Sequence, residues 1–384
     1  MAGPDQPARL FRNTEVMTIA NLMKEGESCA LFAIGNSGKS RLLQSLAKQP
    51  VRERIFGAAW PQYMPIYVDG NGLLEDSAWG LYELMLDSAL TMLNDCCDAE
   101  TYPRLSEAIR DLHMEHTRVV EDDPKWAYRW LARAVGTLFR KLALRNVAFL
   151  LDDIDRLIVN LDPALFRQLK SLRDRHKDRL SYVVATRRPV PDLCPKDRLR
   201  EIDGFYKLIK ANTYPLGLYH PDDARDMVHT LMRRVDFVLT TTVQHALIHE
   251  SGSHPGLLRA AFFALRANRA LVEAQVGGGY RLRVADPAHP PEEPDMYRVG
   301  EIIHDMLKED AGIREECYDI WAGLDTYEQI VFENLVTGGA SGDHESVIAG
   351  LAQKRLLKAG GDEKQQIFSP LFAEYVREIA TRRS

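Results

Sequence analysis

The sequence predicts an α/β fold in which a parallel sheet carries helices on both faces. Runs rich in apolar residues, with the length of buried strands, occur at Cys29–Phe32, Pro65–Asp69, Val147–Leu151 and Tyr182–Thr186. Stretches with helical spacing of apolar residues separate these runs. Strands that alternate with helices form parallel sheets, and burial on both faces explains their nearly continuous apolar character.

A glycine-containing loop joins the first strand to the helix predicted from Arg41 to Lys48. Ala33–Ser40 matches the pattern GxxxxGK(S/T) of phosphate-binding loops, except that Ala33 stands at the first glycine. Gly35 and Gly38 let backbone N–H groups turn inward and form an anion site at the start of the helix. The strand, loop and helix together favour a nucleotide site over a glycine turn with a surface lysine.

The last residues of the loop supply the chemistry of this site. Lys39 can reach the β and γ phosphates of a nucleotide, and the Ser40 hydroxyl can ligate magnesium. We therefore expect ATP and Mg²⁺ as cofactors. The expected loop contacts to the nucleotide come from Gly35, Asn36, Ser37, Gly38, Lys39, Ser40 and Arg41.

Three carboxylates follow the strand Val147–Leu151, at the edge where a parallel sheet presents side chains to a ligand. Asp152 is expected to hold the metal, directly or through water, because the loop needs a carboxylate to complete the magnesium shell. Asp155 either belongs to the site or caps the helix that begins near Arg156. The alternative for the whole cluster is a buried strand that ends in an acidic turn.

Four short motifs resemble the STAND and AAA+ superfamily of P-loop ATPases. They are the acid cluster Leu150–Asp155, the strand Tyr182–Thr186 with Arg187-Arg188-Pro189 after it, the turn Gly252–Gly256, and the segment Phe11–Glu15. The last segment is similar to the GRxxE motif of the superfamily, with Phe11 in place of glycine. The resemblance extends in motif order over roughly residues 9 to 384 and is greatest to bacterial STAND-like and origin-recognition-like members.

This resemblance implies roles for residues around the phosphate loop. Asp153 stands where many of these ATPases carry a glutamate that orients the attacking water, and its shorter side chain implies slow hydrolysis. Thr186 or Arg187 falls at the position that senses the γ-phosphate, and Arg12 falls on the adenine side. The expected catalytic residues are thus Lys39, Asp153 and Arg187. The alternative for Arg187 and Arg188 is a solvated basic edge.

The resemblance also implies a nucleotide-sensing element in a lid. His254 and Pro255 fall at a position that, in the superfamily, reports nucleotide state from the lid domain. The alternative is that Ser253–Gly256 forms only a turn before the helix that contains Leu257, since proline readily opens a helix.

The chain is expected to divide into four parts, because 384 residues exceed the usual size of one domain. The clearest linker is Gly277–Gly279 with Asp286–Pro294 after it. The helical lid is expected to run to about Val276. The four parts are a P-loop ATPase core over 1–215, the helical lid over 216–276, a linker and connecting helix over 277–311, and a winged-helix domain over 312–384.

The winged-helix interpretation comes from the order of elements near the C-terminus. Thr326 is expected to cap a first helix, and a second helix carries Val347, Ile348 and Leu351. A hairpin pairs Arg355–Lys358 with Gln365–Phe368 across Gly360–Glu363, and Pro370 opens the last helix. This order is similar to the C-terminal winged helices of origin-type and STAND ATPases, which makes DNA binding the role that the resemblance implies.

Charge argues against DNA as the preferred partner of this C-terminal part. Residues 312–384 hold 8 lysines and arginines against 12 aspartates and glutamates, whereas a surface that binds phosphates needs cations. Residues 167–210 hold 13 basic against 6 acidic residues. That basic stretch is a solvated helix face, an arginine finger between subunits of a homo-oligomer, or a DNA-facing edge. A protein partner bound through the winged helix is therefore favoured over DNA.

Several other classes of protein are not favoured. The N-terminal residues lack a basic region followed by an apolar core, and no apolar run has the length of a membrane span, so a cytoplasmic location is expected. Five scattered cysteines read as reduced thiols. His245 and His249 have HxxxH spacing but no glutamate between them, so the zinc-protease pattern fails.

The interpretation that combines these features is a regulatory ATPase, a nucleotide-dependent switch whose winged-helix end relays nucleotide state to a partner. One alternative is a DNA-loading or DNA-remodelling AAA+ ATPase of the origin or transposition type. Another is a nucleotide-gated scaffold without useful turnover.

Overall fold

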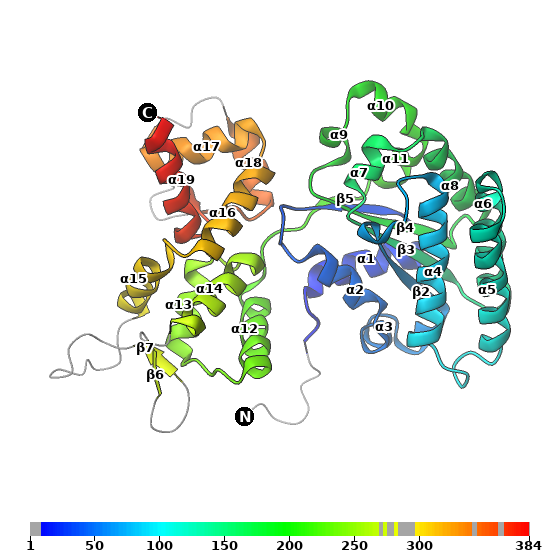
Figure 1. Ribbon diagram of the computed structural model, residues 1–384, viewed down its shortest axis with the longest axis horizontal. Coiled ribbons are helices and arrows are strands. Elements are labelled where there is room, and N and C mark those ends of the chain that lie inside the picture. Colours follow the sequence, from blue (N-terminus) through cyan, green and yellow to red (C-terminus); the bar gives the residue numbers. More distant parts are fainter. Residues whose placement is uncertain are drawn as a thin grey trace. The chain divides into compact units, whose positions relative to one another are not determined.

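The computed structural model describes residues 9–268, 272–274, 280–282, 296–339, 344–359 and 365–383 (Figure 1). The chain forms two compact units. The first consists of residues 1–33 and 38–214, and the second of residues 34–37 and 215–384. The expected linker segments Gly277–Gly279 and Asp286–Pro294 and the hairpin turn Gly360–Glu363 lie outside the described residues.

A five-stranded sheet with the order β2-β3-β4-β1-β5 forms the centre of the first unit. The pairs β2–β3, β3–β4 and β4–β1 are all parallel, as the sequence predicts. Because β4 lies between them, the strand before the phosphate loop and the strand before the acid cluster are not neighbours. The strands are β1 (Cys29–Phe32), β2 (Tyr63–Asp69), β3 (Asn146–Asp152), β4 (Leu180–Thr186) and β5 (Thr213–Pro215).

Alternate residues of the central strands face opposite sides of the sheet. One side carries a large hydrophobic core that includes Ile66 of β2, Phe149 of β3 and Tyr182 of β4. Figure 1 shows several helices gathered on this side. They are α4 (Ala78–Cys96), α5 (Leu105–Glu121), α6 (Ala127–Lys141), α8 (Pro163–Arg175) and α11 (Asp203–Lys210).

The opposite side of the sheet is covered by the helices that flank the phosphate loop. Helix α1 (Asn13–Glu25) contacts β3, and α2 (Lys39–Ala47) contacts both β2 and β3. Short elements complete the unit: α3 (Gln49–Phe56), η1 (Gly57–Gln62), η2 (Gly70–Gly72), η3 (Pro124–Trp126), α7 (Asp155–Asn160), α9 (Val190–Leu193) and α10 (Lys196–Glu201).

The second unit is mostly helical. Its elements are α12 (Pro221–Val235), α13 (Thr241–Glu250), α14 (Pro255–Ala267), β6 (Val272–Ala274), β7 (Tyr280–Leu282), α15 (Met296–Leu307), α16 (Ala311–Gly323), α17 (Thr326–Thr337), α18 (Glu345–Gln353), β8 (Leu357–Ala359), β9 (Gln365–Ile367) and α19 (Pro370–Arg383). Both β6–β7 and β8–β9 are antiparallel pairs. Within the described residues, no helix combines the length and apolar character that a membrane span needs.

Two features of this unit differ from the sequence prediction. Helix α14 ends at Ala267 and an antiparallel pair follows, whereas the sequence predicted a helical lid to about Val276. Val272 and Tyr280 are residue types that favour strands, which accounts for this difference. Asp325 caps α17 one residue before Thr326, because Asp325 and Glu328 form a reciprocal capping box.

Candidate functional site

The phosphate loop has the backbone of an anion-binding turn. Asn36 and Gly38 have positive φ angles of 53° and 89°, so these two residues provide the left-handed conformation. Gly35, the other glycine of the loop, does not have a positive φ. Ala33 is also outside the left-handed region, which explains why alanine is tolerated at the first glycine position.

Lys39 begins α2 and bends back over the loop. Its Nζ donates a hydrogen bond to the carbonyl oxygen of Ala33 over 2.9 Å, and its side chain is buried. Burial lowers the pKa of Lys39, while the charges of Asp153, Asp155 and Asp152 act in the opposite direction. The ammonium group therefore lies within electrostatic reach of all three acids.

Asp152 is the last residue of β3 and is fully buried. Its Oδ2 accepts a hydrogen bond of 2.9 Å from the hydroxyl of Tyr67, and its carboxylate is also hydrogen-bonded to Ser40. Burial raises the pKa of Asp152, whereas the hydrogen bonds from Ser40 and Tyr67 act to lower it. The last residue of the phosphate loop and the strand-end carboxylate thus meet in the first unit.

Asp153 follows with a positive φ of 49°, an uncommon conformation for a residue other than glycine. Its Oδ2 accepts a hydrogen bond of 3.0 Å from Nδ2 of Asn71, which lies just after β2. Asn71 and Tyr67 were missed from the sequence, although both lie in or directly after the predicted strand Pro65–Asp69.

Asp155, the third acid of the cluster, is hydrogen-bonded to the end of β4. It is the first residue of α7, and no side chain caps that helix. Its Oδ1 instead accepts a hydrogen bond of 2.8 Å from the backbone N–H of Arg187, just after β4. Burial raises the pKa of Asp155, and the Arg187 N–H acts to lower it. Asp155 therefore fixes the end of β4 beside the acid cluster.

Thr186 and Arg187 at the end of β4 differ in their exposure. Thr186 is buried, and its hydroxyl donates to the carbonyl oxygen of Arg188 over 2.7 Å. Arg187 is exposed, and its charge acts to lower the pKa of Lys39. Arg187 is therefore the strand-end side chain that can turn toward a ligand near Lys39.

Arg12 precedes α1 and is buried with a positive φ of 48°. Its guanidinium bonds to Oε1 of Glu15 over 3.3 Å. The exposed Arg41 lies 4.5 Å from the ring centroid of Phe11, beside Arg12 in sequence. These contacts bring Arg41 to the segment that the sequence assigns to the adenine side.

Residues 34–37 of the loop belong to the second unit, where two side chains contact them. Nδ1 of His254 accepts the backbone N–H of Leu257 at the start of α14, which leaves Nε2 as the donor to the carbonyl oxygen of Gly35 over 3.2 Å. Nδ2 of Asn36 donates to Oε2 of Glu316 over 3.0 Å. Pro255 is the first residue of α14 and carries no hydrogen donor of its own.

Glu316 was not among the residues that the sequence indicated. It lies on α16, and burial raises the pKa of its carboxyl group while the Asn36 hydrogen bond acts to lower it. A side chain at Gly256 would collide with this carboxylate and with Asn36, so only glycine permits the close approach. The contact of Glu316 with Asn36 depends on tertiary packing, so no local sequence motif could have predicted it.

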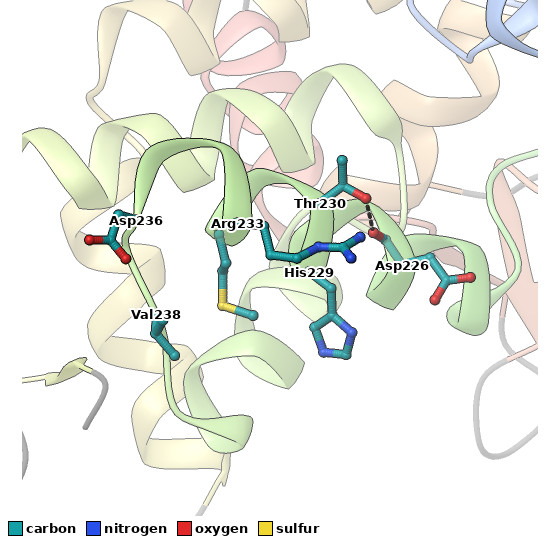
Figure 2. Close-up of a pocket in the computed structure, with 7 residues that line it drawn as sticks. Asp226, His229, Thr230, Arg233, Asp236 and Val238 are labelled. Atoms are coloured by element: carbon teal, nitrogen blue, oxygen red, sulfur yellow. Dashed lines mark hydrogen bonds between the residues drawn. The ribbon is translucent and has the colours of Figure 1, made fainter. Parts of the chain in front are cut away.

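A cavity of about 700 Å³ lies elsewhere in the second unit, along α12 (Figure 2). Its lining mixes acids, bases and apolar groups, and none of these residues belongs to the phosphate loop or to a strand end. The lining residues are Asp226, His229, Thr230, Met232, Arg233, Asp236 and Val238.

The residues around Asp152 fit a magnesium ion that is bound together with a nucleotide. Mg²⁺ in such sites takes one or two carboxylates, with phosphates and water as the other ligands. Asp152 and the Ser40 hydroxyl, already hydrogen-bonded to each other, provide one carboxylate and one hydroxyl. Among the described residues, no group of three or more His, Cys, Asp or Glu side chains is arranged to hold a metal without such a ligand.

Comparisons with known proteins identify the fold. No protein-family model matches the chain, and no curated protein matches its sequence. The chain is similar to the RuvB Holliday junction branch migration motor of Thermotoga maritima (12% identity, 93% and 92% of the two chains, TM-score 0.40). It is similar to the ORC2 protein of Aeropyrum pernix (10% identity, 99% and 97%, TM-score 0.45). A Walker-type ATPase of Pyrococcus abyssi matches at 13% identity, with 96% of each chain covered and a TM-score of 0.53. With the parallel sheet and its phosphate loop, this match shows that the chain has the fold of a P-loop ATPase.

Proposed function

We propose that the protein binds ATP with Mg²⁺ and hydrolyses it slowly, as a nucleotide-dependent switch. The observation that carries the proposal is the packing of α2, which begins with Lys39 and Ser40, against β3, which ends with Asp152. This packing brings together two motifs more than a hundred residues apart, as a metal and a phosphate chain require, and Ser40 acts on the Asp152 carboxyl group. Mg²⁺, when bound, would neutralise phosphate charge and polarise the γ-phosphate.

Different residues of the chain have different roles in the proposed site. The inward N–H groups of the loop and the Lys39 ammonium bind the phosphates, and Asp152 with Ser40 holds the metal. Asp153 orients the attacking water, and Arg187 faces the γ-phosphate from the end of β4. We assign Arg12 and Arg41 to the base side of the nucleotide. The remaining assigned contacts are those of Gly35, Asn36, Ser37, Gly38, Thr186, His254 and Pro255.

The proposed switch involves the contacts of residues 34–37 within the second unit. His254 donates a hydrogen bond to Gly35, and Glu316 accepts one from Asn36. Both hydrogen bonds therefore depend on the conformation of the loop. We propose the division into an ATPase core, lid, linker and winged-helix domain, with α17, α18, β8–β9 and α19 as the winged helix. Its partner would be a protein.

A nucleotide-gated scaffold without useful turnover is the second candidate. The short Asp153 side chain is already engaged by Asn71, which favours this reading. Calorimetric titration of the full chain with ATP and Mg²⁺, followed by phosphate-release assays with and without DNA, separates the candidates. We expect micromolar or tighter binding and slow turnover that DNA does not stimulate. Absence of nucleotide binding would overturn the proposal.

A further inference from the structure

Tyr67 of β2 lies on the magnesium side of the proposed site, outside every motif that identifies the site. Ile66 and Val68 face the large hydrophobic core, so Tyr67 faces the opposite side of the sheet, which α2 covers. The register of the parallel strands sets Tyr67 beside Leu150 and Asp69 beside Asp152. Tyr67 is therefore two residues from the strand end, under the helix that begins with Lys39.

The hydroxyl of Tyr67 belongs to a chain of hydrogen bonds. It donates to Oδ2 of Asp152 over 2.9 Å and is also hydrogen-bonded to the side chain of Gln44. At the other end of the chain, Asp152 is hydrogen-bonded to Ser40. Ser40 and Gln44 are four residues apart and lie on the same face of α2.

These contacts fix the orientation of the Asp152 carboxylate. An ionised carboxylate only accepts hydrogen bonds, so the tyrosine must donate. Oδ2 is held by Tyr67, and Oδ1 is held by the backbone N–H of Asp153 over 3.1 Å. With one donor on each oxygen, the carboxylate plane has a defined rotation toward Ser40.

We propose that Tyr67 is a positioning residue that holds the Asp152 carboxylate in the orientation needed for Mg²⁺. The inference rests on the proposed function, because it concerns the same site. Hydrogen-bond partners of metal-binding side chains typically contribute about 10- to 100-fold to metal affinity. Tyr67 would therefore determine how tightly the metal binds to the nucleotide complex, and would leave metal-free nucleotide binding unchanged.

The test uses the full-length chain with Tyr67→Phe, which removes only the hydroxyl. ADP affinity is measured by calorimetry in EDTA, and Mn²⁺ is then titrated into the ADP complex while electron paramagnetic resonance reports free Mn²⁺. We expect ADP affinity in EDTA within about twofold of the wild type and a loss of Mn²⁺ affinity of about 10- to 100-fold. Gln44→Ala, which frees Tyr67 from one neighbour, is expected to give a smaller loss.

Tyr182→Phe is the matched control, because it removes a tyrosine hydrogen bond of the same 2.9 Å length, to the carbonyl oxygen of Leu169, on another strand of the sheet. It should change stability and leave Mn²⁺ affinity unchanged. Unchanged Mn²⁺ affinity in Tyr67→Phe, or an equal loss of ADP affinity in EDTA, would overturn the positioning role while the proposed function stands. A wild-type chain that binds no ADP at all would overturn both.

Discussion

At the scale of single residues, the phosphate loop depends on charges that are held close together. Lys39 is buried beside three carboxylates, and its ammonium is hydrogen-bonded to Ala33 within the loop. Burial lowers the pKa of Lys39, and the charges of the acids act in the opposite direction. In the proposed function, the ammonium exchanges this backbone oxygen for phosphate oxygens.

The first prediction concerns this ammonium. A hydrogen bond to a charged group contributes about 1.5–3 kcal/mol, so Lys39→Ala should weaken ATP binding by about 100-fold or more when contacts to two phosphates are lost. Calorimetry measures the affinity, and circular dichroism shows that the fold is retained. Arg41→Ala, at the exposed neighbouring position, serves as the comparison and should have a smaller effect. Unaltered affinity in Lys39→Ala would contradict the nucleotide site.

The second prediction separates the two adjacent acids. Asn tolerates the left-handed backbone of residue 153 and occupies the same volume, so Asp153→Asn should keep ATP bound. General-base groups contribute about 10² to 10⁴ in rate, so its turnover should fall by about that factor. Asp152→Ala should instead lose the Mg²⁺-dependent part of the affinity. Equal turnover of Asp153→Asn and wild type would remove Asp153 from catalysis.

At the scale of helices and strands, a buried acid joins two helices of the second unit. Oε2 of Glu250 on α13 accepts a hydrogen bond of 2.9 Å from Nδ1 of His304 on α15. Oε1 of Glu250 accepts a hydrogen bond of 3.0 Å from Nδ1 of His249. The hydrogen bond to Glu250 raises the pKa of His304 against the effect of burial. Burial acts to raise the pKa of Glu250, but the two histidines lower it overall.

The third prediction follows from the signs of these shifts. The His304 contribution to stability is complete below the ordinary histidine pKa of 6.5 and is lost as pH rises through the raised value. The Glu250 contribution is complete above 4.5 and is lost as pH falls through its lowered value. The contact should therefore be strongest between these limits. Glu374 and Lys308 also face His304.

His304→Gln provides the measurement. Thermal unfolding midpoints are measured from about pH 5 to 8 for the wild type and the variant. Above about pH 6.5, the midpoint of the wild type should fall more steeply with rising pH than that of the variant. His249→Gln, at the exposed partner of the same acid, is the comparison. Parallel curves for wild type and His304→Gln would show that this histidine does not contribute.

Local features of the sequence predicted most of the fold, and they indicated the phosphate loop and the acid cluster of the candidate site. β3, β4 and the loop were predicted because each is a continuous run with its own periodicity or glycine pattern. Tyr67 and Asn71 were missed because their partners, Asp152 and Asp153, are brought close only by the register of β2 with β3, across more than eighty residues. The pair β6–β7 was missed because a short apolar stretch after a helix does not distinguish a further turn from a strand.

At the scale of the whole molecule, the basic stretch 167–210 offers fewer cations for binding DNA phosphates than its composition indicates. Arg173 is buried and donates to the carbonyl oxygen of Gly26, and Arg179 donates to the carbonyl oxygen of Leu144. Lys170 pairs with Asp174. Other cations of the stretch are exposed, among them Arg175 and Lys177 near the end of α8 and Arg187 after β4.

The fourth prediction is that duplex DNA binds the full chain weakly. Non-specific affinities are about 10⁻⁴ to 10⁻⁶ M at physiological salt, and Arg175 and Lys177 together contribute a salt slope of about 2 at most. Fluorescence anisotropy at about 50 and 200 mM salt should give this result, and Arg175→Gln with Lys177→Gln should reduce the slope. Arg377→Gln on α19 is the control. Nanomolar binding that Arg377→Gln abolishes would favour the DNA-remodelling alternative.

The order of the strands has a consequence for the time at which the proposed nucleotide site can form. β1 pairs with β4, so Cys29 and Val183, 154 positions apart, must meet before the strand that leads into the phosphate loop is secured. At synthesis rates of about 5–20 residues per second, the ribosome needs roughly 8–30 s to add the intervening chain. During that interval β1 has no sheet to join. A nascent chain therefore acquires the proposed nucleotide site only after β4 is made.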